Sequence, residues 1–254
     1  MAKGDRSQAR IAYSISVAQN TSHAPENGTI ADLLARMPLF AVLSHEVRGN
    51  LARQLRLHSA RRGELIYVEG EPGHTAHIVL SGKVKSTRST NDGRERLLAM
   101  HGPGDMFGEL SLLDPGPRVA TATALTRLEY ASLDNAQLKV WLTEHNEASW
   151  LLLQVLGHRL RQVNEDIADL FFADVPGRVA KALLDLGERF GIPVEVGLKV
   201  EHGLTQEELA QLVGASRETV NKALSDFASQ GWLELGTREV VLLDRDRLIR
   251  RARW

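Results

Sequence analysis

The stretch LTQEELAQLVGASRETVNKALSDFASQG, residues 204–231, decides the fold of the C-terminal part of the chain. Thr205 followed three residues later by Glu208 is a capping box, which predicts the start of a helix. The inward-facing positions of that helix are Leu209 and Leu212, and Gly214 marks its end. The stretch therefore opens with a short, well-capped helix that stops at a tight turn.

A second helix follows the turn directly. Ser216 is a typical N-cap residue, and Gly231 stands just beyond the last periodic position. The next residues, WLELGTREVVLLD (232–244), predict two short strands around Gly236 and Thr237. The whole arrangement is predicted as a helix-turn-helix with a β-wing, and the apolar residues that we expect inside the second helix are Val220, Leu224 and Phe227.

Four polar residues remain on the outer face of the second helix near its start: Arg217, Glu218, Asn221 and Lys222. Arg and Lys donate to guanine O6 and N7, and Glu accepts from cytosine N4, so this face has base-reading chemistry. The alternative is a solvated face with a Glu218–Lys222 pair one turn apart. Because the capped first helix and the wing flank this helix, we favour the reading of DNA in the major groove.

The middle of the chain has a different texture. Between Arg61 and Leu133, glycines separate short segments rich in strand-forming residues, which predicts a compact antiparallel roll or barrel. NDGRE, residues 91–95, is a hairpin signal within it. Residues 30–57, before the roll, have helical spacing that is interrupted at Pro38.

Residues 146–172 are predicted to form one long helix. Its apolar positions are spaced alternately three and four apart, which is the seam of a two-stranded coiled coil; they are Leu153, Leu156, Leu160, Val163, Ile167 and Leu170. Self-association is the interpretation that we favour, and burial against the helix's own domain is the alternative. DVPGR, residues 174–178, then predicts a Pro/Gly hinge before a further helical segment.

The composition of the 254 residues excludes several classes of protein. No cysteine is present, which excludes disulfides, a cysteine-bound iron–sulfur cluster and a cysteine nucleophile. A net charge of −1 gives no bulk indication of nucleic acid, so that case depends on local geometry. Residues 1–28 are expected to be a disordered tail. Without an apolar run of 18 residues we expect no membrane partner and a cytoplasmic location.

An enzyme is not expected either. His45-Glu46 is not followed by the second histidine of a zinc-protease motif, and the sequence contains neither a P-loop nor a G-x-S-x-G pattern. We also expect no metal site.

DPGPRVATATA, residues 114–124, places one arginine between turn formers and small residues. Pro115, Gly116 and Pro117 predict a rigid corner that presents Arg118, and no bulky side chain follows it in the Ala/Thr alternation. Such a corner suits an anion.

Four features together resemble the catabolite activator protein (CRP/FNR) family of transcription regulators, and most closely its actinobacterial GlxR-type branch. They are EELAQLVGASRETVNKAL, DVPGRVAKALL, FGELSLLDPGPR and the glycine-spaced roll. The resemblance covers roughly residues 30–254 and implies an α+β fold. Its expected parts are a cyclic-nucleotide-binding β-roll domain (29–145), a dimerisation helix and hinge (146–174), and a winged helix-turn-helix DNA-binding domain (175–254).

The resemblance implies a homodimer that reads a TGTGA-type palindrome in double-stranded DNA. Arg217, Glu218 and Lys222 would contact bases, and the residues expected at phosphates are Ser216, Thr219 and Thr205. RNA polymerase is the further partner that the resemblance implies.

The resemblance also identifies GELSLLDPGPRVA, residues 108–120, as a phosphate-binding cassette for cyclic AMP. Glu109 would bind the ribose hydroxyl and Arg118 the cyclic phosphate, and the cassette residues expected around them are Gly108, Leu110, Ser111, Val119 and Ala120. A short helical turn with free N–H groups and one guanidinium suits a single phosphate. On the long helix, Arg159 would contact phosphate, and Val163 and Asn164 the adenine.

Two positions depart from the family pattern. Val119 replaces a Ser or Thr whose hydroxyl binds the phosphate, and Val163 replaces a Thr that binds the purine. A hydrogen bond to a charged group contributes about 1.5–3 kcal/mol, so Val119 alone would weaken binding roughly 10- to 100-fold. Cyclic AMP is the expected effector; another nucleotide, or no ligand, remains the alternative.

Overall fold

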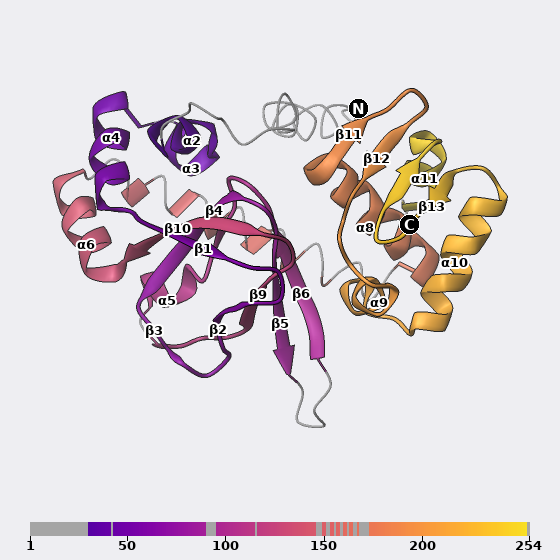
Figure 1. Ribbon diagram of the computed structural model, residues 1–254, viewed down its shortest axis with the longest axis horizontal. Helices are drawn as coiled ribbons and strands as arrows, with labels where there is room; N and C mark the ends of the chain where they lie inside the picture. Colours follow the sequence, from indigo (N-terminus) through magenta and orange to yellow (C-terminus); the bar gives the residue numbers. More distant parts are fainter. Residues whose placement is uncertain are drawn as a thin grey trace, which may run out of the picture.

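The computed structural model shows two lobes side by side, residues 30–145 and residues 173–252 (Figure 1). The residues that the structure describes are 30–41, 43–89, 95–114, 116–145, 149–150, 153–154, 156–157, 160–161, 163–164, 167 and 173–252. The expected tail, residues 1–28, lies outside them. Within the described residues no helix is long and apolar enough to cross a membrane.

The first lobe begins with three helices, α2 (Ile30–Arg36), α3 (Pro38–Ala41) and α4 (His45–Gln54). Ser44 caps α4 by accepting a hydrogen bond from the Val47 N–H. The expectation that helical structure extends to Leu57 was wrong, because Arg56 already begins strand β1 (Arg56–Ala60). Pairing of β1 with β10 (Leu128–Asp134) supplies the backbone hydrogen bonds that a longer helix would have made.

The rest of this lobe is the predicted antiparallel roll. One sheet has the strand order β1-β10-β4-β7, a second has β2-β9-β5-β6, and β3 pairs with β8. The remaining bounds are β2 (Leu65–Tyr67), β3 (Pro72–Gly73), β4 (Thr75–Ser81), β5 (Val84–Ser89), β6 (Glu95–His101), β7 (Met106–Phe107), β8 (Gly116–Pro117) and β9 (Thr121–Ala124). Strands β5 and β6 pair antiparallel, as the hairpin prediction requires, although residues 90–94 lie outside the described part.

Two short helices complete the first lobe: α5 (Leu110–Leu113) and α6 (Asn135–Glu144). Asp134 and Gln137 form a capping box at the start of α6, which turns the chain away from β10. Trp141 of α6 is buried with Leu34 and Leu51 of the N-terminal helices against Ile78 of β4. The helices therefore cover one sheet of the roll.

The second lobe contains the predicted helix-turn-helix, formed by α9 (Gln206–Val213) and α10 (Arg217–Ser229). The capping box of Thr205 and Glu208, the N-cap Ser216 and the left-handed Gly214 are all confirmed. The wing strands β13 (Leu233–Leu235) and β14 (Val240–Leu242) are also confirmed. The sequence did not indicate the other two strands of that sheet, β11 (Gly191–Pro193) and β12 (Leu198–Val200), or the last helix, α11 (Arg245–Ala252).

The Pro/Gly hinge predicted over residues 174–178 was wrong. Helix α8 (Val175–Phe190) begins directly after Asp174, which caps it by accepting a hydrogen bond from Gly177 N–H at 2.9 Å. Proline is tolerated in the first turn of a helix, where its missing N–H has no partner to lose. Arg251 of α11 pairs with Asp174 at 2.6 Å and ties this helix start to the C-terminus.

The two lobes share one apolar core. Leu97 and Met100 of β6 and Leu125 of the β9–β10 connection are buried in the same cluster as residues of α8, α9 and α10. Gly102 makes room for the Phe190 ring, since a Cβ there would lie 2.3 Å from Phe190 Cε1. The roll and the helix-turn-helix are therefore packed directly against each other.

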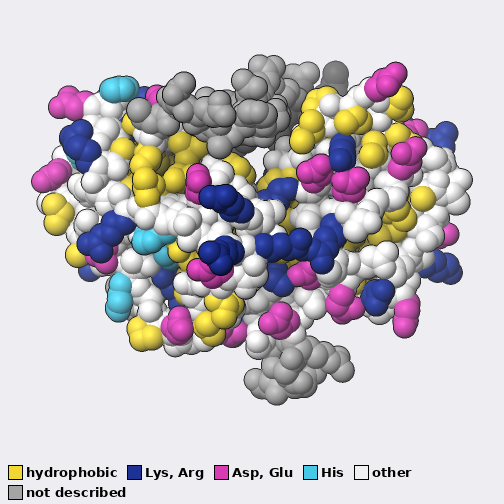
Figure 2. Space-filling view, in the orientation of Figure 1, with side chains coloured by type: hydrophobic (Ala, Val, Ile, Leu, Met, Phe, Trp, Pro, Cys, Tyr) yellow, Lys and Arg dark blue, Asp and Glu magenta, His cyan; other side chains and the backbone are white. Residues whose placement is uncertain are grey.

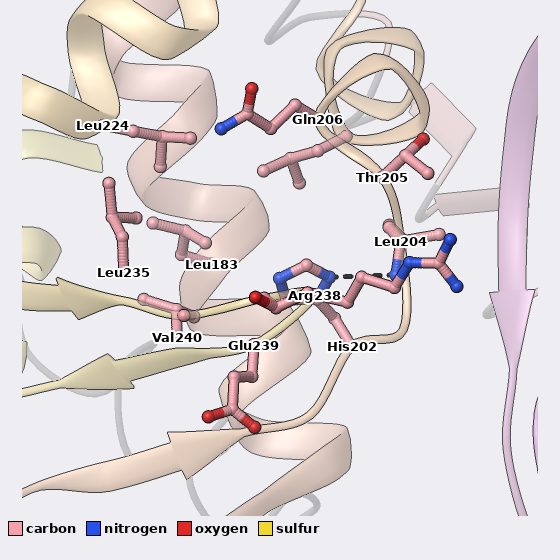
Figure 3. Close-up of a pocket in the computed structure, with 13 residues that line it drawn as sticks. Leu183, His202, Leu204, Thr205, Gln206, Leu224, Leu235, Arg238, Glu239 and Val240 are labelled. Atoms are coloured by element: carbon pink, nitrogen blue, oxygen red, sulfur yellow. Dashed lines mark hydrogen bonds between the residues drawn. The ribbon is translucent and has the colours of Figure 1, made fainter.

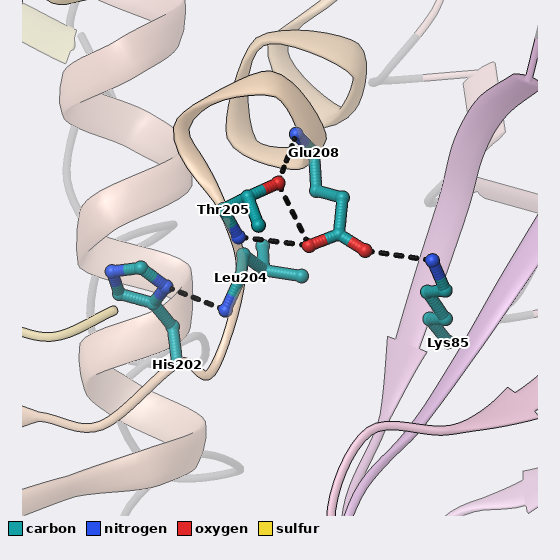
Figure 4. Close-up of polar contacts among 5 residues, drawn as sticks. All are labelled: Lys85, His202, Leu204, Thr205 and Glu208. Carbon is teal, nitrogen blue, oxygen red and sulfur yellow. Dashed lines mark hydrogen bonds and ion pairs between the residues drawn. The ribbon is translucent and has the colours of Figure 1, made fainter. Parts of the chain in front are cut away.

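Charged contacts surround that core. Lys85 of β5 pairs with Glu208 of α9 at 2.6 Å, with both side chains less than one-fifth exposed (Figure 4). Arg189 of α8 pairs with Asp105 at 2.5 Å and donates to the Met100 carbonyl at 2.7 Å. Figure 2 shows Lys and Arg side chains gathered along this junction between the lobes.

The described positions of the predicted long helix have helical backbone. Three residues of its apolar seam are exposed on this chain: Leu153 is 59% exposed, Leu160 62% and Ile167 47%. Leu156 is partly buried, and Leu170 lies outside the described residues. These apolar side chains are thus not covered by their own lobe.

Two buried histidines make the stability of the fold depend on pH. Burial, with Arg118 and His58 adding to it, lowers the pKa of His77 from 6.5 to about 3. Burial and the nearby Lys83 lower the pKa of His202 from 6.5 to about 4, although Glu239 and Glu208 oppose the shift. Both rings are neutral when folded, so between pH 6.5 and these values the unfolded chain binds more protons than the folded chain.

We expect the free energy of unfolding to fall below pH 6.5, by up to about 1.4 kcal/mol per pH unit for each of these groups. Urea unfolding of the wild type and of His202→Gln at pH 4.5, 5.5, 6.5 and 7.5 checks this. Gln keeps an acceptor for the Leu204 N–H, which His202 Nδ1 accepts at 3.1 Å. The variant should lose less stability per pH unit below pH 6.5, and parallel curves would contradict the assignment to His202.

Candidate functional sites

Arg118 is buried in the roll and held on several sides. It is 6% exposed. Its Nη1 donates to the Thr75 carbonyl at 2.7 Å and to the Gly108 carbonyl at 3.0 Å, and its Nη2 donates to Thr75 Oγ1 at 2.8 Å. The Tyr67 ring lies 4.1 Å from the guanidinium carbon. The contacts fix the orientation of the cation.

This arrangement corrects the prediction of an open corner without bulky neighbours. Gly116 and Pro117 are not a free turn, because they pair with Pro72 and Gly73 as the two-stranded β8–β3 ladder. The pairing draws Arg118 inward beneath the Tyr67 ring, which comes from a strand far away in the sequence.

The surroundings of Arg118 leave its charge poorly compensated. The groups that accept its hydrogen bonds are two carbonyls, a hydroxyl and, at 3.5 Å, His77 Nε2, and none of these carries a negative charge. Burial lowers the pKa of Arg118, while nearby Tyr67, Glu71 and Glu109 raise it. Arginine stays protonated in proteins, so an anion brought to this site would meet a preorganised, partly desolvated cation.

The cassette residues around Arg118 divide into a buried and an exposed set. Glu109 and Ser111 are buried at 8% and 5% exposure, and Ala120 is buried as well. Gly108 has φ +70°, and a Cβ there would lie 2.7 Å from Arg118 Nη1. Leu110 and Val119 are 50% and 53% exposed, so aliphatic side chains stand at the surface of the cassette.

The structure brings part of the predicted nucleotide site together. The Gly108 carbonyl contacts Arg118 directly, and Ser111 Oγ and Arg118 Nε both border the position that a Gly73 Cβ would occupy. Val163 and Asn164 are helical and exposed, and among the described residues no hydrogen bond links Asn164 to the cassette. Arg159 lies outside the described residues.

Sequence reasoning missed three residues that build this site: Tyr67, Thr75 and His77. Thr75 stands 43 residues before Arg118, and nothing in the local pattern of β4 marks it. The one available signal is Gly73 in EPGH, because a glycine is needed where Ser111 and Arg118 approach the backbone.

The predicted reading face of α10 is largely exposed. Arg217, Glu218, Thr219 and Lys222 are all exposed, and Ser216 Oγ lies 2.8 Å from Thr219 Oγ1. Their exposure leaves the N-terminal end of α10 open to the edge of a duplex.

Asn221 corrects one part of that prediction, since it is half-buried. Its Oδ1 is buried without a hydrogen-bond partner in the described part of the chain. The reason is the helix period, which turns position 221 toward the flank beside buried Val220 and Leu224.

Thr205 is exposed and also has a structural role. Its hydroxyl accepts a hydrogen bond from the Glu208 N–H and lies 3.0 Å from Glu208 Oε2 (Figure 4). A contact of Thr205 with a phosphate would therefore be made at the capped end of α9.

Arg178, which sequence reasoning left as part of the hinge, holds the turn of the helix-turn-helix. It donates to the Val213 carbonyl at 3.0 Å and to the Gly214 carbonyl at 3.3 Å. It also donates to the Ala173 carbonyl at 2.8 Å. One side chain thus satisfies the carbonyls at the end of α9 and connects them to the segment before α8.

A cavity of about 320 Å³ lies between the start of α9 and the wing (Figure 3). Leu183, Leu224 and Leu235 contribute apolar walls, and Arg238 and Glu239 come from the wing turn. The cavity is distinct from the Arg118 site, since none of the cassette residues lines it.

Comparison with known proteins agrees with this geometry. Residues 57–145 match the cyclic nucleotide-binding domain model, and residues 177–251 match the Crp-like helix-turn-helix domain model. Over 222 residues the chain is 51% identical to the CRP-like cAMP-activated global transcriptional regulator of Mycobacterium tuberculosis, covering 87% of this chain and 99% of that protein.

Two further relatives agree. The cyclic AMP receptor protein of Thermus thermophilus is 36% identical over 72% of this chain and 84% of its own length. The structure of FixK2 from Bradyrhizobium japonicum superposes with a TM-score of 0.68 at 28% identity, over 77% of this chain and 96% of that one. The relatives named here for an activity are regulators and not enzymes. With its roll, its helix-turn-helix and these relatives, the chain belongs to the CRP/FNR family of transcription regulators.

Proposed function

We propose that this protein is a homodimeric, sequence-specific DNA-binding regulator whose effector is cyclic AMP. The observation that carries the effector is Arg118, a buried guanidinium whose acceptors are all neutral. The observation that carries DNA reading is the exposed Arg217, Glu218 and Lys222 at the start of α10. The relatives named for cyclic AMP support the choice of ligand.

A ligand-independent regulator, or a sensor of another nucleotide, is the second candidate. Val119 favours it, because this half-exposed side chain offers no hydroxyl to a phosphate at Arg118. Val163 offers none to a purine. On either candidate the protein acts in the cytoplasm on promoters, with RNA polymerase as its protein partner.

The packing of the lobes suggests how a ligand would act on DNA binding. The roll that holds Arg118 shares its core with α8 and α9 through Leu97 and Met100. A ligand shifts a two-state equilibrium by the difference in its affinity for the two states. A nucleotide that also contacts the long helix would bias the placement of the two reading helices.

The dimer is expected to form through the seam of the long helix. Burial of Leu153, Leu160 and Ile167 would each contribute about 1.5–3 kcal/mol. Sedimentation velocity at micromolar concentration should show a dimer for the wild type and a monomer for Leu153→Glu with Leu160→Glu. Val140→Glu, which changes an equally exposed apolar residue of α6, is the control. A monomeric wild type would refute this assembly.

Arg217 is expected to specify a base, whereas Thr219 positions the backbone. Arg217→Ala should cost about 1–3 kcal/mol and relax the preference at one base pair of a TGTGA-type half-site. Thr219→Ala should weaken all sequences alike; Thr205 is unsuitable because it caps α9. Binding to the palindrome and to base-substituted variants separates the two effects, with Arg245→Ala on α11 as the control. Unchanged sequence preference in Arg217→Ala would contradict the base-reading role.

The two valines are expected to make cyclic AMP binding weak and to leave appreciable DNA binding without ligand. Val119→Ser with Val163→Thr should tighten cyclic AMP binding at least tenfold, since each restored hydroxyl adds a hydrogen bond. Calorimetry on the wild type, both single variants and the double variant measures this, with operator affinity recorded with and without ligand.

The single variants are needed because Val163→Thr also places a hydroxyl near the seam. Wild-type affinity equal to that of the double variant would show that the valines do no harm. No binding by any variant would reject cyclic AMP and favour the second candidate.

A further inference from the structure

Thr75, the first residue of β4, meets Arg118 with two different groups. Its carbonyl accepts a hydrogen bond from Nη1 at 2.7 Å, and its side-chain Oγ1 accepts one from Nη2 at 2.8 Å. Both terminal nitrogens of the guanidinium are thus fixed by a single residue. The Gly108 carbonyl takes the second Nη1 hydrogen at 3.0 Å.

These contacts leave one side of the guanidinium for a ligand. Within the described part of the chain, the hydrogen bonds of Arg118 use Nη1 and Nη2 and do not use Nε. The Nε side faces Gly73 and Ser111, where the chain omits a side chain. The Nε–H and an adjacent Nη2–H form the edge of arginine that binds phosphate in a bidentate manner.

His77 stands behind Thr75 and supports the same orientation. Its Nε2 lies 3.4 Å from Thr75 Oγ1 and 3.5 Å from Arg118 Nη2. Because arginine can only donate, Nε2 must be an acceptor, and the ring proton is therefore assigned to Nδ1. The ring is held in place by stacking on Tyr67 and by Phe107, its partner across β7.

We propose that Thr75 is a positioning residue of the effector site, which holds Arg118 with its Nε edge turned to the phosphate of the ligand. His77 assists by accepting from the Thr75 hydroxyl and from Arg118. The inference rests on the proposed function in one respect, the identity of the anion. Preorganisation of a charged donor raises affinity because the ordering cost is met during folding and not on binding.

The test uses Thr75→Val, which keeps the β-branched shape and the backbone carbonyl and removes the Oγ1 acceptor. Thr75→Ser restores the hydroxyl. Thr123→Val on β9, another partly buried threonine of the roll, is the matched control. All three are compared with the wild type as full-length proteins.

The first measurement needs no ligand. Nitrogen-15 NMR of the Arg118 Nε–H, assigned by its loss in Arg118→Lys, reports hydrogen exchange and the rotation of the guanidinium. We expect a slowly exchanging, ordered signal in the wild type, in Thr75→Ser and in Thr123→Val, and fast exchange in Thr75→Val. An ordered signal in Thr75→Val would overturn the positioning role.

The second measurement is calorimetry with cyclic AMP. Affinity should fall about tenfold in Thr75→Val and recover in Thr75→Ser, with Thr123→Val unchanged. Equal affinity in Thr75→Val and the wild type would overturn the inference. If the wild type binds no cyclic AMP, the proposed ligand fails; in that case a guanidinium signal lost only in Thr75→Val would still support the role of Thr75.

Discussion

The packing of β6 of the roll against α8 and α9 is the contact on which the rest of the structure depends. Leu97 and Met100 are each 2% exposed, and they belong to the apolar core of the helix-turn-helix lobe. Lys85 and Glu208 close the edge of this contact, and Glu208 is also the capping residue of α9. The effector lobe and the reading lobe therefore form one body within the chain.

This packing gives Arg118 its importance. A buried cation among neutral acceptors is tolerated because Thr75, Gly108 and Tyr67 satisfy its donors and cover its face. The same environment favours an added negative charge. Since the roll is joined to the lobe that carries α10, an anion at Arg118 is positioned to influence DNA binding, and the two valines set how strongly.

The elements with local signals were predicted well. Thr205 and Glu208 fix the start of α9, Gly214 fixes its end, and the alternation in TATA buries Ala122 and Ala124 in the roll, because caps and periodicity depend on residues a few positions apart. The failures were also local. Pro176 was interpreted as a hinge although proline fits a first helical turn, and Leu57 was assigned to a helix before strand β10 was available to pair with it.

The sequence by itself determined the family, the helix-turn-helix and the residue types of both sites, since these follow from short-range patterns. The tertiary structure decided which groups meet. Thr75 and His77 reach Arg118 across 43 and 41 residues, and Lys85 reaches Glu208 across 123. The half-burial of Asn221 and the inward turn of Arg118 likewise depend on neighbours from other elements. Such contacts arise from strand pairing and lobe packing, which leave no periodic trace in the chain.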